Sequence, residues 1–365
     1  MTKPPKQLTM ITDLGESKLI ERLTKDFEIH HKTTTLSIGD DAAVIDFDSD
    51  CSVISTDLLI DGIHFNLDYT HLKQLGYKSV IVNISDIYAM NAIPKYILVS
   101  IAVSNRFSVE SLEQLYQGIQ LACKNYHIEL IGGDTSSNHR GLQISITAIG
   151  SSKKEKIVKR SGASKGDLLV VSGDLGAACL GLLVLERENQ RISKNANYQP
   201  KFEPYRYFVG RQIKPEASKS TVQILEENDI VPTSMIDISD GLSTELSHLS
   251  QASNVGFKIL ENKIPVHSNL IEFSSEFKLN YLDLVFNGGE DYELLFTIKQ
   301  KDLPIIASIP TLSVIGGTVH HGNKNLLIKE DGTELEIKPS GWDGFKDLTK
   351  SHIQTHHDDE STNES

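Results

Sequence analysis

The sequence lacks the features of a membrane or secreted protein. Apolar stretches such as Ile97–Val103 and Leu180–Leu185 have the length of core elements and are too short to span a bilayer. Residues Met1–Leu19 are polar and contain no apolar signal-peptide core. Three cysteines occur among 365 residues, without metal-site or disulfide spacing. These absences predict a cytoplasmic protein that has no membrane partner.

Positive charge is also in short supply. The chain has 36 Lys and Arg residues against 49 Asp and Glu residues, which gives a formal net charge of −13. Nucleic acids and anionic membranes are not attracted by bulk acidity, so we expect neither as a partner. An anionic substrate must bring cations or meet a local basic patch. Walker-A, Gly-rich kinase-loop and dinucleotide-binding patterns are absent as well, so phosphate binding has to be argued on other grounds.

What the sequence does have is a set of five short acidic patches, each combining carboxylates with Gly, Ser, Thr or Asn. No Lys or Arg lies beside them in sequence to pair with them, and hard oxygen ligands of this kind suit Mg²⁺ that carries phosphates. The patches therefore predict a site for a metal-bridged polyphosphate. They are Gly39–Ala43, Ser55–Asp57, Asn83–Asp86, Gly132–Thr135 and Asp237–Gly241.

Each patch also has a simpler interpretation. Gly132–Thr135 follows the apolar segment Ile128–Ile131 and is typical of a turn, although paired glycines also let backbone N–H groups approach an anion. Gly39–Ala43 can be a loop bend, and Ser239 and Asp240 can be helix N-caps. Asp57 can end a strand and Asp86 can be a solvated helix position. Together the patches favour a site, since most lie at strand or helix ends, where α/β proteins place their sites.

Hydrophobic periodicity predicts two α/β halves. The apolar stripe of the helix at 74–90 leaves Asn83 and Asp86 on the opposite face, pointing away from the core. A polar segment at 151–159 is expected to link the halves, 189–203 to be a surface excursion, and the tail beyond 348 to be disordered. The expected helices are 16–27, 74–90, 108–126, 176–188, 218–227 and one that begins at about 242, and the expected strands are 51–56, 96–103, 142–149, 167–172, 235–238, 256–260, 293–298, 313–316 and 326–329.

Four residues outside the patches are candidates for ligand contacts. Arg160 can clamp a phosphate bidentately or be an exposed linker arginine. His64 can meet an anionic substrate, although a lone histidine is more often structural. Glu290 is expected, with Asp291, at the exposed end of a strand. Trp342, the only tryptophan, either pins the C-terminus to the core or stacks on a ring-shaped ligand.

These blocks, in this order, closely resemble the thiamine-monophosphate kinase family, within the aminoimidazole ribonucleotide synthetase-like superfamily. The most specific parts are Ser-Thr-Asp followed by Gly-x-His-Phe, together with Gly-Gly-Glu-Asp-Tyr-Glu-Leu. The resemblance extends to Phe345 and implies a two-domain fold of mixed α/β (α+β) class. The matching blocks are Gly15–Ile20, Gly39–Ala43, Ser55–Phe65, Lys78–Met90, Ile131–Thr135, Arg160–Asp167, Ile236–Leu242, Gly288–Thr297 and Gly341–Phe345.

The resemblance implies ATP-dependent phosphorylation of thiamine monophosphate to thiamine diphosphate with several Mg²⁺ ions. It implies an N-terminal domain (1–150) that binds ATP and Mg²⁺, a C-terminal domain (151–348) that completes the nucleotide and substrate site, and a disordered tail (349–365). It also implies a homodimer joined through the N-terminal sheets. Carried over by position, Gly133, Asp134, Arg160 and Ser239 would contact ATP, and His64, Glu290 and Trp342 would contact thiamine monophosphate. The metal residues would be Asp41, Ser55, Thr56, Asp57, Asp86, Asp134, Asp237 and Asp240.

The chain departs from the family pattern in three places: Ser17 replaces a usual aromatic residue, Gly344 replaces a frequent histidine, and 189–203 is poorly matched. Within the superfamily, aminoimidazole ribonucleotide synthetase is the nearest rival activity. Selenophosphate synthetase is disfavoured because no cysteine lies in a reactive N-terminal Gly-rich motif, and a non-enzymatic thiamine-phosphate sensor would not need all the metal carboxylates. No general base is expected, because an acceptor phosphate is already mostly ionised near neutrality. The hypothesis is therefore direct in-line phosphoryl transfer.

Overall fold

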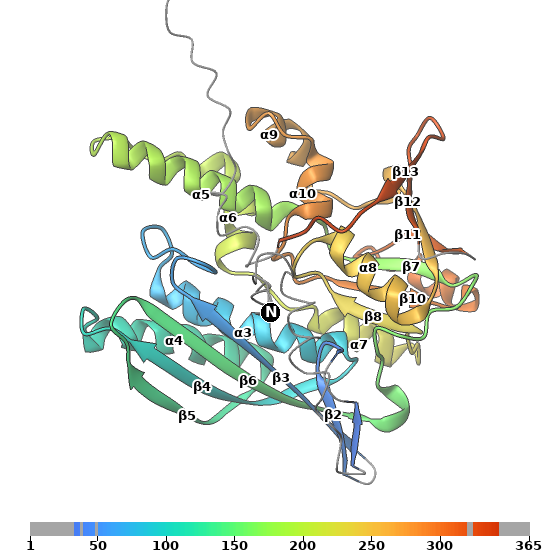
Figure 1. Cartoon of the computed structure of the whole chain (residues 1–365), viewed down its shortest axis with the longest axis horizontal. Helices are drawn as coiled ribbons and strands as arrows, with labels where there is room; N and C mark the ends of the chain where they lie inside the picture. The colour runs from blue at the N-terminus through green and yellow to red at the C-terminus, as the bar shows by residue number, and fades with distance from the viewer. Residues whose placement is uncertain (1–32, 37–38, 48–49, 320–323, 343–365) are drawn as a thin grey trace, which may run out of the picture. The chain divides into compact units, whose positions relative to one another are not determined.

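The computed structural model describes residues 33–36, 39–47, 50–319 and 324–342 (Figure 1). Ile29–Gly341 form one compact unit, and Trp342 is the one described residue of a second unit made from the two ends of the chain. The expected helix at 16–27 and the tail at 349–365 lie outside the described residues. Each half of the described chain contributes one β-sheet, which confirms the mixed α/β class.

The first sheet has the strand order β1-β2-β3-β6-β4-β5. All neighbouring strands pair antiparallel except β4 and β5, which are parallel. Buried and less buried residues alternate along β6 because one face of the sheet meets the core. The strands are β1 (Thr34–Leu36), β2 (Ala43–Phe47), β3 (Asp50–Ile60), β4 (Ile93–Val103), β5 (Glu129–Ser137) and β6 (Leu142–Lys153).

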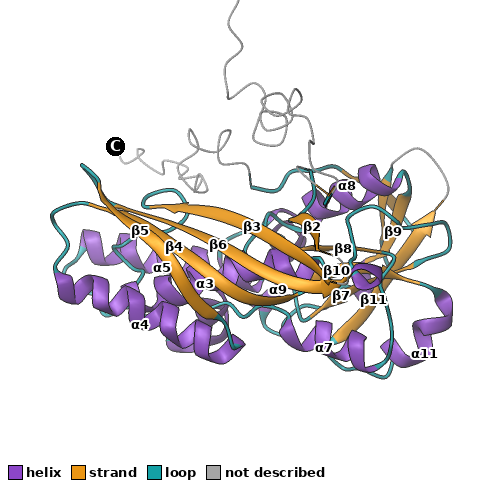
Figure 2. Cartoon of the chain, turned by 90° about the horizontal axis from the view of Figure 1, so that it is seen from below, coloured by secondary structure: helices purple, strands orange, loops and turns teal. Residues whose placement is uncertain are grey.

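Helices α3 (Leu72–Ala89) and α4 (Val109–Tyr126) cover one face of this sheet (Figure 2). They cross at backbone contact through two glycines. A Cβ added to Gly76 would lie 2.0 Å from the carbonyl oxygen of Leu115, and one added to Gly118 would lie 1.9 Å from that of Lys73. Only glycine permits so close an approach, so these two residues fix where the helices meet.

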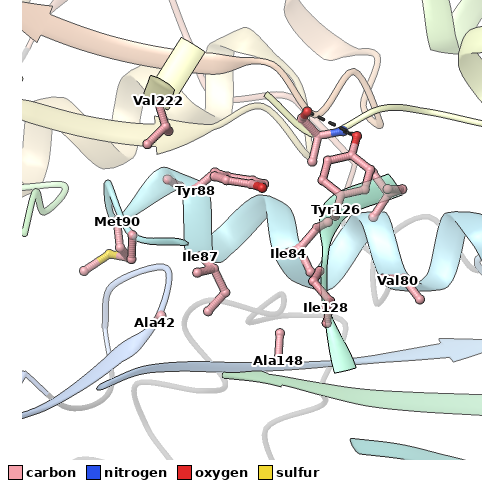
Figure 3. Close-up of a cluster of buried hydrophobic side chains, with 14 of the residues drawn as sticks. Ala42, Val80, Ile84, Ile87, Tyr88, Met90, Tyr126, Ile128, Ala148 and Val222 are labelled. Atoms are coloured by element: carbon pink, nitrogen blue, oxygen red, sulfur yellow. Dashed lines mark hydrogen bonds between the residues drawn. The ribbon is translucent and has the colours of Figure 1, made fainter. Parts of the chain in front are cut away.

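The polar face of α3 is buried, contrary to the expectation of a face turned away from the core. Asn83 is 0% exposed and Ser85 is 1% exposed. Figure 3 shows the cause: Ile84 and Ile87 point toward the sheet, where Ala148 lies, while Tyr88 lies on the opposite side of the helix, which is also the side of Val222. Elements of the second half pack on that side, including β8. The helix is thus enclosed on both sides, and its polar residues need partners inside the protein.

The second sheet has the order β13-β12-β9-β11-β7-β10-β8, with only β9 and β12 parallel. Its strands are β7 (Leu168–Ser172), β8 (Ser234–Asp237), β9 (Gly256–Leu260), β10 (Leu294–Ile298), β11 (Leu312–Val319), β12 (Asn325–Ile328) and β13 (Glu334–Ile337). The helices are α5 (Ala177–Lys194), α6 (Arg206–Ile213), α7 (Lys219–Glu227), α8 (Leu242–Ser253), α9 (Leu270–Glu276), α10 (Tyr281–Asn287) and α11 (Leu303–Ile306). The division between the two sheets falls between β6 and β7, and the domain limits at 150 and 348 stay a prediction.

Two expected local structures are wrong. The segment Gly132–Thr135 is not a turn, because β5 runs through it and pairs with β4. The surface excursion expected at 189–203 begins later, because α5 continues to Lys194. The buried Glu188 then anchors the irregular segment by accepting hydrogen bonds from the Tyr198 hydroxyl (2.7 Å) and the Lys201 amide (2.9 Å). Within the described residues, no helix is long and apolar enough to cross a membrane.

Candidate active site

Three carboxylates from distant parts of the chain meet at one point. Asp41 lies in the turn before β2, Asp86 lies on α3 and Asp237 ends β8. One oxygen from each lies within 4.8 Å of the others. Such a set of hard oxygen donors fits Mg²⁺, and in the absence of a cation the three negative charges repel one another. The cluster thus joins three of the acidic patches.

Burial and mutual repulsion alter the titration of these carboxylates. Burial, followed by the charge of Asp41, raises the pKa of Asp237 to about 7, even though the Ser85 hydroxyl donates a hydrogen bond to it at 2.6 Å. Burial and then the charges of Asp57, Asp237 and Asp41 raise the pKa of Asp86 well above its usual range. A divalent cation would relieve both effects, because it favours the ionised carboxylates.

Strand β3 supplies the side of the cluster next to the first sheet. The Ser55 hydroxyl donates to the Asp86 carboxylate at 2.5 Å, and the Asp57 amide donates to the Asn83 side-chain oxygen at 2.9 Å. Thr56 lies between them with its side chain on the opposite face of the strand, since side chains alternate along β-structure. Its hydroxyl donates to the carbonyl of Ile146 at 3.0 Å. Ser55 and Asp57 therefore face α3 and its Asp86, while the Thr56 side chain does not.

Arg160 is a cationic partner for Asp41, although no such partner was expected for the acidic patches. Its Nη2 lies 2.8 Å from one oxygen of Asp41 and its Nε 3.1 Å from the other. Although burial alone would lower its pKa, the charge of Asp41 raises the pKa of Arg160 above its usual value. Asp40 accepts weaker bonds from the Arg160 amide at 3.3 Å, and burial together with Asp41 raises the pKa of Asp40 to about 6. The partner was missed because it lies 119 positions from Asp41.

The turn after β8 carries Ser239 and Asp240, which are both half-buried. A buried acid that sequence reasoning missed, Glu245 on α8, accepts a hydrogen bond from the Asp240 amide at 2.9 Å. Burial and then the charge of Asp240 raise the pKa of Glu245 well above its usual range. Its signal in the sequence was an acid one turn into the helix that follows Gly241, a position where a carboxylate can cap the helix start.

Gly133 and Asp134 lie apart from this cluster. Both are exposed on β5, an edge strand that is separated from β3 by β6 and β4. Three strand spacings amount to roughly 14 Å. A Cβ on Gly133 would lie 1.8 Å from the carbonyl oxygen of Val99, so this position requires glycine for strand packing. Within the described chain, these two residues are not brought to the carboxylate cluster.

The backbone of Glu290 is tied to the turn after β8 that carries Ser239. Its amide donates to the carbonyl of Ser239 at 2.7 Å, and its φ of 69° is a left-handed conformation that is uncommon outside glycine. The Glu290 carboxylate lies 2.6 Å from the Nζ of Lys78 and accepts a hydrogen bond from Gln212 at 2.5 Å. Sequence reasoning assigned no role to Lys78 or Gln212, because α3 and α6 meet only in the folded chain.

The other two acceptor-site candidates differ from Glu290. His64 accepts a hydrogen bond on Nδ1 from the Ile60 amide at 3.0 Å. Burial lowers its pKa, while the Glu290 charge acts in the opposite direction and Lys78 acts in the same direction. His64 therefore lies in the electrostatic field of the Lys78–Glu290 pair. Trp342 is half-buried and belongs to the unit formed by the chain ends, so its place in the site stays a prediction.

Asp291 is buried, contrary to the expectation of an exposed strand end. It is 1% exposed, and its carboxylate accepts hydrogen bonds from the amides of Gly176 (2.7 Å) and Ala178 (3.3 Å) at the start of α5. Burial raises its pKa to about 7. This carboxylate occupies the positive end of the helix dipole. The N-terminus of α5 is therefore capped from within the protein and is not offered to a phosphate.

The chain is similar to known proteins over most of its length. Residues 39–152 match the family described as AIR synthase related protein, N-terminal domain. The thiamine-monophosphate kinase of Bacillus subtilis is 31% identical over 91% of this chain and 100% of that protein. The thiamine-monophosphate kinase of Aquifex aeolicus is also 31% identical, over 92% of this chain and 99% of that protein.

Solved structures give the same picture. The structure of AaThiL complexed with AMPPCP and TMP matches with a TM-score of 0.77 and 31% identity, covering 93% of this chain and 99% of that one. The hydrogenase maturation protein HypE in complex with ATP matches with a TM-score of 0.63 at 19% identity, over 91% of this chain and 98% of that one. At that identity the second likeness shows the fold alone, which is the two-sheet architecture described above.

Proposed function

This chain belongs to the thiamine-monophosphate kinase family, and we propose that it transfers the γ-phosphoryl group of ATP directly to thiamine monophosphate, giving thiamine diphosphate and ADP. The observation that carries the proposal is the convergence of Asp41, Asp86 and Asp237 within 4.8 Å. Family membership supports the reaction, since the two thiamine-monophosphate kinases described above align with more than nine tenths of this chain. Transfer without a phosphoenzyme is the finer part of the proposal.

The protein groups have separate tasks in this reaction. Asp41, Asp86 and Asp237 would hold Mg²⁺, which when bound would supply charge neutralisation for two mutually repelling phosphate anions. Ser55 and Ser85 orient the carboxylates of Asp86 and Asp237 through their hydrogen bonds. Arg160 uses two of its five N–H donors on Asp41, and we assign the others to the phosphates of ATP. Positioning and charge neutralisation of this kind make up most of phosphoryl-transfer catalysis.

The remaining predicted ligands complete this assignment. Asp57 lies on the side of β3 that faces the carboxylate cluster, and Asp240 lies in the turn after β8. Both are therefore proposed as metal residues, together with Ser55. Thr56 is proposed to contribute a main-chain atom to the metal site, because its side chain faces the other side of the strand. Ser239 would contact ATP, and His64 and Trp342 would contact thiamine monophosphate.

We also propose a homodimer formed through the first sheet, with Gly133 and Asp134 acting at the joined site. All nine residues of β5 are exposed, and Leu130 and Ile131 are 45% and 53% exposed. Exposed apolar residues on an edge strand favour pairing with another chain. Size-exclusion chromatography with light scattering should give twice the mass of 40.5 kDa. A stable monomer at working concentrations would rule the dimer out.

The three free thiols fit a cytoplasmic location.

The test of the function is product analysis. Incubation with Mg²⁺, ATP and thiamine monophosphate should give thiamine diphosphate and ADP in equal amounts. Free thiamine should not replace the monophosphate, because a hydroxyl acceptor lacks an ionised nucleophile. Asp57→Asn should abolish turnover, whereas turnover at the wild-type rate would remove Asp57 from the metal role. Pulse-labelling with γ-labelled ATP should leave the protein unlabelled, and a labelled protein intermediate would exclude direct transfer.

A further inference from the structure

The group with an unexplained buried polar atom is Gln212 on α6. Gln212 is 6% exposed, and its side-chain Nε2 donates to the Glu290 carboxylate at 2.5 Å. Its Oε1 is buried and has no hydrogen-bond partner among the residues that the structure describes. A buried acceptor without a partner is costly, so natural proteins usually supply a partner for it. The missing partner must be an N–H or O–H donor.

The orientation of this amide is fixed by its surroundings. Glu290 accepts and cannot donate when ionised, so the amide nitrogen of Gln212 must face it and the oxygen must point elsewhere. Helix α6 cannot shift easily, because a Cβ on Gly181 of α5 would lie 2.1 Å from the carbonyl of Phe208 and 3.0 Å from the Cβ of Gln212. Rotating the amide would place its oxygen against a carboxylate. The acceptor of Gln212 is therefore held in place before any ligand arrives.

Lys78 holds the carboxylate beside this acceptor. The Lys78 side chain is 5% exposed and that of Glu290 is 27% exposed, so Glu290 is the more open member of the pair. The 2.6 Å contact neutralises the carboxylate without using all of its lone pairs. The result is a neutral pair of hydrogen-bond acceptors, the buried amide oxygen of Gln212 and the partly exposed carboxylate of Glu290.

We propose that Gln212 is a specificity-determining residue that, with the Glu290 carboxylate held by Lys78, accepts hydrogen bonds from the exocyclic amino group of the acceptor's pyrimidine ring. This inference rests on the proposed function, because thiamine monophosphate carries that amino group at the end opposite its phosphate. An amino group attached to an aromatic ring has two N–H donors and no charge, which matches two adjacent acceptors in a neutral setting.

The distance to the metal cluster suits such an acceptor. Lys78 and Ser85 are seven residues apart on α3, which is about 10 Å along the helix axis. Ser85 donates to Asp237 of the metal cluster, and Lys78 contacts Glu290. One helix thus connects the two ends of the site, and a molecule with a ring at one end and a phosphate at the other spans that length.

The test compares two acceptors in the wild-type protein and in variants at position 212. The acceptors are thiamine monophosphate and its analogue with an oxo group in place of the amino group, which presents an oxygen to Gln212. The wild-type protein should prefer the natural acceptor in kcat/KM. Gln212→Met, which keeps the length of the side chain, should lower kcat/KM for the natural acceptor about tenfold and lower the preference by a similar factor. The KM for ATP should not change.

Controls separate this role from a structural one. Gln212→Asn shortens the side chain by one methylene and should also lose the preference, which covers the case in which the Met variant folds poorly. Gln117→Leu, at an exposed position on α4, should keep both the preference and the rate. Lys78→Met should raise the KM for thiamine monophosphate. Lys78→Arg should bring the KM part of the way back to the wild-type value, as expected for a positioning residue.

The outcomes distinguish the two proposals. An active wild type, together with folded Met and Asn variants that keep the wild-type preference within twofold, would overturn the assignment of Gln212 and leave the kinase function in place. A wild type that does not phosphorylate thiamine monophosphate would overturn the proposed function and this assignment with it. Loss of the preference in both variants at an unchanged KM for ATP supports the assignment.

Discussion

Replacing Asp237 with asparagine should stabilise the metal-free protein while it removes metal binding. Asp237 is 3% exposed and faces Asp41 and Asp86, so its negative charge is disfavoured in the folded state. Asparagine keeps an oxygen that can accept the hydrogen bond from Ser85, and its NH₂ group can donate to the neighbouring carboxylates. The substitution therefore removes a repelling charge and leaves the hydrogen bonds satisfied.

The size of the effect follows from the pKa of Asp237, which burial and the charge of Asp41 raise from 3.8 to about 7. A shift of about three units corresponds to roughly 4 kcal/mol, an upper limit because the carboxylates of the cluster titrate together. The folded pKa exceeds the unfolded one, so the penalty is absent below the unfolded value, grows between about pH 4 and pH 7, and is complete above pH 7. Stability of the metal-free wild type should fall over that range as pH rises.

The assay is denaturant unfolding in EDTA and in excess Mg²⁺. At about pH 8 without metal, Asp237→Asn should be more stable than the wild type by up to about 4 kcal/mol, and the gain should shrink toward pH 4. Added Mg²⁺ should stabilise the wild type and have little effect on the variant. Glu113→Gln, at an exposed position on α4, serves as the control for removal of one negative charge.

Three results would refute the reasoning. A metal-free variant less stable than the wild type at pH 8 would mean that the Asp237 charge is favourably paired. Equal stabilisation of both proteins by Mg²⁺ would mean that the cation binds elsewhere. A gain that persists unchanged to pH 4 would assign the effect to packing and not to charge.

Four further predictions concern other parts of the structure. Arg160→Gln should raise the KM for ATP by about tenfold or more in initial-rate kinetics, because charge-assisted hydrogen bonds to phosphate are lost; an unchanged KM would remove Arg160 from the nucleotide site. Gly118→Ala should lower the free energy of unfolding by about 1–3 kcal/mol, since its Cβ would lie 1.9 Å from the Lys73 carbonyl oxygen. Gly210→Ala on α6 has no atom within 4 Å of the added Cβ and should be neutral or stabilising in the same unfolding assay. Asp291→Ala should cost about 1–2 kcal/mol at neutral pH through the lost cap of α5, and an unaltered unfolding midpoint would contradict that role.

Local pattern was sufficient for the elements with strong periodicity. The helix expected at 108–126 is observed as α4, Val109–Tyr126, and the strand expected at 142–149 lies within β6. Amphipathic elements of this kind are fixed by the contrast between their two faces. The acidic patches also indicated that carboxylates from distant segments converge, and Asp41, Asp86 and Asp237 do so.

Long-range packing determines the structure at the positions where the local sequence pattern predicts it wrongly. Asn83 and Ser85 of α3 are polar, which suggests exposure, but β3 contacts Asn83 and β8 contacts Ser85. Gly132–Thr135 has the composition of a turn, but pairing with β4 extends the strand through it. Asp291 lies in a polar block, but it is drawn inward by the amides at the start of α5. In each case the deciding partner is far away in sequence, so no local window contains it.

The enclosure of α3 has a consequence for selectivity. Helix α3 contacts Asp237 of the carboxylate cluster through Ser85, and it contacts Glu290 through Lys78, two turns earlier. The helical rise therefore fixes the distance between these two contacts. Inserting one residue between those positions would turn one end by about 100° relative to the other and uncouple the two ends of the site. Acceptors with a longer or shorter spacer between ring and phosphate would meet the same mismatch from the ligand side.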